Sequence, residues 1–122
     1  MKLNTKMPDN LNPFYVEELV KFDSAWSKQE IATAWHHLER AHIISQRYPL
    51  QHTETHWKMF LLGIKTTNLK EIVGQLIRLI FGAPLSFINK IPVGNVGSSR
   101  VSMIQSQPLP ADIQEIFEEM ET

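Results

Sequence analysis

The sequence contains no cysteine. This absence excludes disulfide bonds, thiolate ligands for a metal ion and a cysteine nucleophile. It is typical of proteins kept in the reducing cytoplasm, so we expect a cytoplasmic location. Histidine and the carboxylates are then the side chains through which a transition metal would be bound.

A dominant charge and a long apolar run are also missing. The 12 Lys and Arg residues nearly balance the 13 Asp and Glu residues, so the net charge is -1 with His neutral. No basic surface for nucleic acid is therefore expected. The most apolar window, residues 72–91, is interrupted by Gln75, Arg78, Pro84 and Asn89. We expect neither a membrane span there nor a secretory signal at the N-terminus.

What is present is the composition of one globular domain. The chain has 122 residues, of which 43% are hydrophobic and 20% charged, enough to bury a core without covalent staples. We expect residues 1–10 to form a flexible N-terminus and residues 11–122 a single helical domain. Repeated prolines and glycines across residues 82–110 predict an irregular segment that wraps the surface.

Apolar residues recur at helical spacing and predict an all-α fold of four main helices plus a short C-terminal helix. The first begins near Asn12, as the cap, and Pro13; the second begins at a capping box from Ser27 to Glu30. The others are expected over 51–65, 69–81 and from about 110. Gly74 in mid-helix indicates close packing of another helix. Antiparallel hairpins can form a bundle or a tetratricopeptide-like stack, and both remain open.

All five histidines fall between residues 36 and 56. His52 and His56 are four residues apart, on one face of the third helix. Glu39 and His42 have the Glu-x-x-His spacing that metal-binding helical bundles use. If the hairpin folds at Pro49, positions 42 and 56 are equidistant from the turn, as are positions 46 and 52.

The spacing therefore predicts a metal site formed by His42, His52 and His56 with Glu39, and with Gln46 beside it. Imidazole and carboxylate ligands suit a divalent ion such as Zn²⁺, Fe²⁺, Ni²⁺ or Cu²⁺. A buried hydrogen-bonded network explains the same histidines without a metal. Acid–base use is a third interpretation, although nothing in the sequence favours one reaction.

Several separated motifs carry a family resemblance. They are His37-Leu38-Glu39-Arg40-Ala41-His42, then His52-x-x-x-His56-Trp57-x-Met59, Gly74-Gln75 and Pro92-x-Gly94-Asn95-x-Gly97. With them the chain resembles a family of short bacterial helical proteins known only as a domain of unknown function. The resemblance implies that the loop containing Asn95 folds back toward the histidines. It adds Asn95 and Gln75 as residues that line the site.

Two functional hypotheses follow. In the first, the domain binds a metal or small ligand through its histidine cluster. In the second, it is a non-enzymatic interaction module for a peptide or a second copy of the chain, and its histidines are purely structural.

Overall fold

The computed structural model describes residues 6–87, 95–100 and 106–120, which contain five helices and no strand. This confirms the predicted all-α fold with four main helices and a short C-terminal one. Among the described residues, no helix has the length and apolar character needed to cross a membrane. The helices are α1 (Asn12–Ser27), α2 (Ile31–Ser45), α3 (Pro49–Lys65), α4 (Leu69–Phe87) and α5 (Ala111–Met120).

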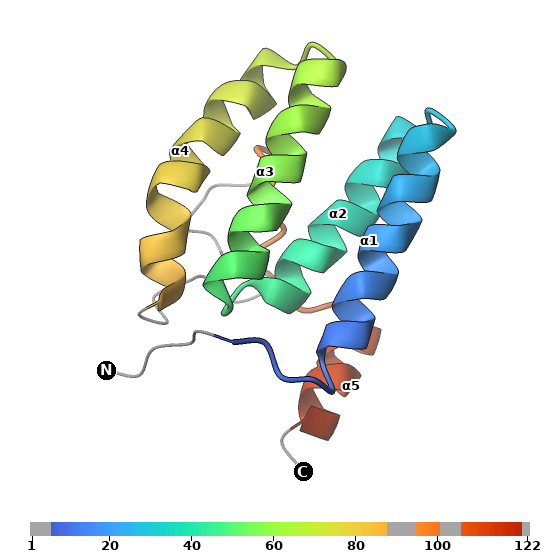
Figure 1. Cartoon of the computed structure of the whole chain (residues 1–122), viewed down its shortest axis with the longest axis vertical. Coiled ribbons are helices and arrows are strands. Elements are labelled where there is room, and N and C mark those ends of the chain that lie inside the picture. The colour runs from blue at the N-terminus through green and yellow to red at the C-terminus, as the bar shows by residue number, and fades with distance from the viewer. Residues whose placement is uncertain (1–5, 88–94, 101–105, 121–122) are drawn as a thin grey trace.

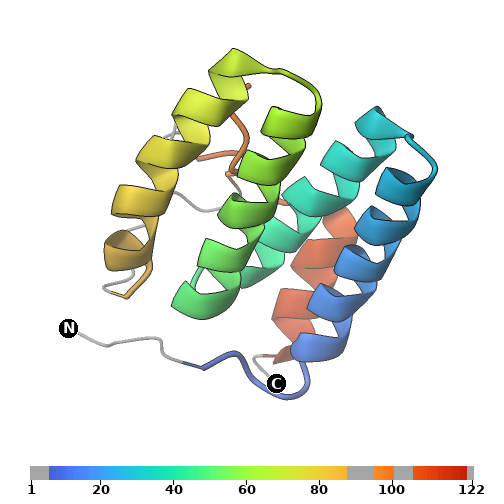
Figure 2. The ribbon, with the colours of Figure 1, turned by 45° about the horizontal axis from the view of Figure 1, so that its top comes forward.

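The four long helices lie side by side in the order α4, α3, α2, α1 (Figure 1), and Figure 2 shows α5 behind α1 and α2. The main packing is between helices that follow one another along the chain: α1 on α2, α2 on α3 and α3 on α4. Short connections between antiparallel helices favour this order. The 95–100 segment, in orange, lies behind α3 and beside α2 in Figure 1.

Prolines start two of the helices, while the N-caps predicted at Asn12 and Ser27 are absent. Pro13 and Pro49 lie in the first turns of α1 and α3, where a missing backbone N–H costs nothing. The N-cap of α1 is Leu11, not the predicted Asn12. The capping box predicted at Ser27 was also wrong. Ser27 ends α1 and its hydroxyl donates to the Ser24 carbonyl, and the N-cap of α2, Glu30, makes no side-chain cap.

The segment predicted to be irregular begins later than expected, because α4 continues to Phe87. Residues 95–100 and 106–110 are non-helical. Residues 1–5, 88–94, 101–105 and 121–122 lie outside the described residues, and with them the motif residues Pro92 and Gly94. Within the predicted flexible N-terminus, Met7 is buried in the core.

Gly74 is approached by a loop and not by the helix that its position predicted. A Cβ atom built there would lie 2.0 Å from the Ser99 Oγ. The 95–100 segment can therefore approach α4 this closely only because position 74 has no side chain. At Gly63 on α3, a Cβ atom would lie 3.1 Å from the Glu71 Cβ of α4. These two glycines bring α4 close to α3 and to the 95–100 segment.

The apolar core divides into two clusters. One joins the start of α1 to the end of α2 and to α5, with Leu11, Tyr15, Ile44, Val96 and Ile113 at its centre. The other joins the end of α1 to the start of α2 and the end of α3, through Phe22, Ala25, Ala34, Leu38, Met59 and Leu62. Among the described side chains of α4, residues 69–80, none belongs to either cluster. Burial of these clusters holds α1, α2, α3 and α5 together.

Candidate metal centre

Three histidines from two helices converge on one point. His42 comes from α2, and His52 and His56 come from successive turns of α3. The His42 Nε2 lies 2.9 Å from the His52 Nε2 and 3.1 Å from the His56 Nε2, and the two α3 nitrogens are 3.0 Å apart. The sequence predicted this meeting from the hairpin geometry, and the structure brings all three together.

The partner of His42 determines which of its nitrogens carries the proton. Its Nδ1 lies 2.8 Å from the backbone carbonyl oxygen of Asn95. A carbonyl oxygen can only accept a hydrogen bond, so Nδ1 carries the hydrogen and donates it. The Nε2 of neutral His42 therefore carries no hydrogen, and its lone pair is directed at the other two histidines.

The side-chain amide of Gln75 determines the tautomer of His56 in the same way. Its Nε2 donates to the Gly97 carbonyl at 2.9 Å and to the Glu71 carboxylate at 3.2 Å. Both partners are acceptors, so the amide oxygen is the atom that faces the His56 Nδ1, at 2.6 Å. His56 therefore donates through Nδ1. Its Nε2 carries no hydrogen, and this second lone pair is directed into the cluster.

The Nε2 of the third ring, His52, lies within hydrogen-bond distance of the Nε2 atoms of both His42 and His56. Its Nδ1 has no hydrogen-bond partner, and it is the one buried side-chain nitrogen or oxygen of which this is true among the described residues. Metal-binding histidines usually have the other nitrogen hydrogen-bonded to a carbonyl or carboxylate. His42 and His56 have this arrangement, and His52 does not.

Burial keeps the cluster neutral. The three histidines are 2–4% exposed. Burial lowers the pKa of His52 to about 4 and, with the charge of a protonated His52 as a second cause, that of His56 to about 3. The pKa of His42 is also well below its ordinary value, mainly through burial and then through its two neighbours. Neutral imidazole is the form that binds a metal ion.

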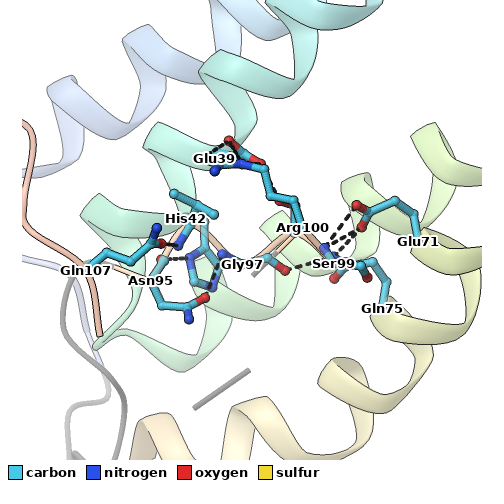
Figure 3. A network of polar contacts seen from close by, with 11 residues as sticks. Glu39, His42, Glu71, Gln75, Asn95, Gly97, Ser99, Arg100 and Gln107 are labelled. Atoms are coloured by element: carbon cyan, nitrogen blue, oxygen red, sulfur yellow. Dashed lines mark hydrogen bonds and ion pairs between the residues drawn. The ribbon is translucent and has the colours of Figure 1, made fainter. Parts of the chain in front are cut away.

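The 95–100 segment lies between His42 and Glu39 of α2 and Glu71 and Gln75 of α4 (Figure 3). The Glu71 carboxylate accepts the Ser99 backbone N–H at 2.9 and 3.0 Å. Glu39 on α2 accepts from the Ser98 hydroxyl and from the Arg100 guanidinium. Two carboxylates on different helices therefore hold the segment that supplies the carbonyl for His42.

Gly97 has a specific steric role in this segment. Its φ is +86°, and a Cβ atom there would lie 2.5–2.7 Å from three atoms of the His42 ring. Both features require glycine, because other residues rarely adopt positive φ and a side chain would displace the ring. The Asn95 side chain supports the same turn by accepting the Gly97 backbone N–H at 2.9 Å.

The structure places the predicted ligand Glu39 outside the group of histidine nitrogens. The Glu39 carboxylate is bonded to Ser98 and Arg100 and is outside the group of ligand atoms that lie within 4.8 Å of one another. Gln46 lines a cavity of about 610 Å³ between the end of α2 and α5. Asn95 meets the cluster through its backbone carbonyl, and Gln75 contacts it directly.

Sequence reasoning did not assign a role to Glu71, Arg78, Ser98 or Ser99. Glu71 and Arg78 are each 7% exposed, and the Arg78 charge contributes to lowering the pKa of His42 and His56. The signal was the polar seam of Glu71, Gln75 and Arg78 on an otherwise apolar helix. A polar seam normally faces solvent, whereas this one faces the 95–100 segment.

Comparison with protein families identifies the chain. Residues 9–117 match the family described as "Protein of unknown function (DUF3703)", so the chain belongs to that family. No match was found among curated proteins or solved structures.

Proposed function

We propose that this member of the DUF3703 family binds one divalent transition-metal ion through the Nε2 atoms of His42, His52 and His56. The observation that carries the proposal is the pair of tautomers set by Asn95 and Gln75. They direct two imidazole lone pairs at each other across 3.1 Å.

The competing interpretation is a neutral hydrogen-bonded network, and the tautomers weigh against it. In such a network, the Nε2–H of His52 is the hydrogen available at the centre. A single hydrogen leaves the contact between the His42 and His56 lone pairs repulsive, in a site too buried for water to screen it. A cation bound to all three lone pairs removes that repulsion.

The distances also suit a metal ion. A triangle with sides of 2.9, 3.0 and 3.1 Å has its centre about 1.7 Å from each corner, slightly less than a Zn–N bond of about 2.0–2.1 Å. Three Nε2 atoms at this spacing could therefore hold one ion with only small movements of the rings. Three neutral imidazoles suit Zn²⁺, Cu²⁺, Ni²⁺ and Fe²⁺.

Burial limits what else such an ion would bind. With the rings 2–4% exposed, a further ligand at an open coordination position would have to be small, such as water or hydroxide. Metal-independent acid–base catalysis is disfavoured, because bases whose pKa values are about 4 and 3 are weak near neutral pH. The proposal is therefore of a metal-binding protein, and we assign it no reaction.

The test is metal binding by protein prepared without a polyhistidine tag and stripped with a chelator. Zn²⁺, Ni²⁺, Cu²⁺ and Fe²⁺ (the last without oxygen) are titrated by calorimetry, and the product is analysed for metal content. We expect one ion per chain. We expect His52→Ala and His56→Ala to lose at least 100-fold in affinity. Gln75→Leu should lose about 10-fold, because it removes the acceptor that orients His56.

His36→Ala is the matched control, because it also removes one histidine but from an exposed position on α2. Affinity should not change in this variant. If wild type binds no ion with one-to-one stoichiometry, or if His36→Ala loses as much affinity as His56→Ala, the proposal is wrong.

A non-enzymatic interaction module is the second candidate, and it does not exclude metal binding. One observation favours it: large apolar side chains are exposed on α3 and α4, Trp57 at 51% and Ile80 at 65% among them. Monomeric soluble proteins rarely leave a large contiguous apolar patch in contact with water.

A further inference from the structure

The helix α4 is inverted relative to an ordinary amphipathic surface helix. Its buried side carries the polar residues Glu71, Gln75 and Arg78, which are at most 7% exposed. Its exposed side carries large apolar residues with 46–71% of their area in contact with solvent: Leu69, Val73, Leu76, Ile77 and Ile80. The inversion arises because the polar side is used to bind the 95–100 segment.

The neighbouring helix α3 shows a second exposed stripe. Leu50, Trp57, Leu61 and Ile64 are 37–74% exposed. The opposite side of α3 carries His52 and His56. Both helices therefore turn their polar functional side toward the metal centre and the 95–100 segment, and both apolar stripes lie on the other face of the hairpin.

The spacing within the stripes is that of a helix–helix seam. On α4, Leu69, Val73, Leu76 and Ile80 follow one another at intervals of four, three and four residues. On α3, Leu50, Glu54, Trp57, Leu61 and Ile64 follow at four, three, four and three. This alternation is the spacing at which side chains insert between those of a facing helix in a coiled coil.

The area is sufficient for a stable complex. The nine apolar side chains together expose roughly 900 Å², compared with about 800 Å² buried per partner in a standard interface. Between Leu69 and Ile80, Lys70 is the exposed charged residue, since Glu71 and Arg78 are buried. The occupant must therefore be an apolar surface of similar size.

We propose that this occupant is a second copy of the chain, with two α3–α4 hairpins packed as a four-helix interface about a two-fold axis perpendicular to the helices. The charges at the two ends of the face favour this arrangement. Glu54, whose carboxylate also accepts a hydrogen bond from the Tyr15 hydroxyl of α1, lies in the second turn of α3, whereas Lys65 and Lys70 flank the turn between α3 and α4. A perpendicular two-fold axis places the acid of one copy near the bases of the other, whereas a parallel arrangement pairs like charges.

The experiment is sedimentation velocity of the full chain over a concentration series up to about 100 µM, a range in which a µM complex is populated. Wild type should sediment as a dimer at the upper end. Leu76→Lys with Ile80→Lys should sediment as a monomer with unchanged helical circular dichroism, because both residues are exposed in the single chain. Val20→Lys, at a 60% exposed position on α1, is the matched control and should remain dimeric.

The relative orientation of the two copies can be tested by disulfide cross-linking, because the chain has no cysteine of its own that would compete. Glu54→Cys and Lys65→Cys proteins, mixed and oxidised, should form the mixed disulfide at least 10-fold faster than either forms its own. A strict monomer at all concentrations, a dimer that survives the double lysine variant, or equal cross-linking in all pairs would overturn the proposal. These results do not depend on whether a metal binds.

Discussion

Replacement of Gly97 by alanine tests how closely the 95–100 segment packs against the histidine cluster. The backbone φ of +86° at this position costs an L-residue about 1–2 kcal/mol. The new Cβ would also lie 2.5–2.7 Å from the His42 ring, and relief of such overpacking costs about 1–3 kcal/mol. With both costs added, the metal-free Gly97→Ala protein should lose about 3 kcal/mol of unfolding free energy, or about 10 °C in Tm for a chain of this size.

The assay is urea unfolding of the metal-free protein at pH 7.5, in a double-mutant cycle with His42→Ala. When the ring is absent, Gly97→Ala should cost only its backbone part, so the two substitutions should show an interaction of about 1–2 kcal/mol. Gly97→Ala alone should also weaken metal binding, because it displaces one ligand. If the cost is the same with and without the His42 ring, the steric argument is refuted.

Other consequences concern pH and the ion pairs. Because the folded-state pKa of His52 is about 4 and that of His56 about 3, below the ordinary 6.5, the unfolded chain gains protons that the folded chain does not. Stability of the metal-free protein should be complete above about pH 6.5 and fall by about 6 kcal/mol toward pH 4, about 3 kcal/mol from each of these two histidines, measured by urea unfolding across pH; a flat profile would contradict the burial of the cluster. Arg40→Ala should cost about 3 kcal/mol, because it leaves the buried Glu18 carboxylate, 2.6 Å from the Arg40 Nε, without this partner. Lys21→Ala, which breaks an exposed pair with Glu17, should cost under about 0.5 kcal/mol in the same assay.

Much of the histidine cluster could be predicted from the sequence, because it depends on local geometry. The four-residue spacing of His52 and His56 places both on one face of a helix, and a turn at Pro49 brings His42 opposite them. The tautomers could not be predicted in this way. They depend on Gln75 and on a carbonyl at position 95, which are 19 and 53 residues away from the histidines that they orient.

The misplaced residues have a common physical reason. Glu39 has the spacing of a metal ligand relative to His42, yet its carboxylate is bonded to Ser98 and Arg100. A carboxylate three residues from a histidine reaches whichever cation or donor the tertiary fold brings nearest. The capping box at Ser27 was wrong for a related reason, since α1 extends to that residue and the hydroxyl bonds within its own helix.

The sequence by itself determined the helical content, the positions of the helix-starting prolines and the meeting of three histidines across one hairpin. These follow from periodicity, fixed proline φ angles and distance from a turn, all of which act over a few residues. Only the tertiary structure decided which side of α4 is buried. Its apolar side would normally enter the core, but the polar groups of the 95–100 segment needed hydrogen-bond partners, and Glu71 and Gln75 supply them. Because an unpaired buried polar group costs more than an exposed leucine, α4 buries its polar side and leaves its apolar side exposed.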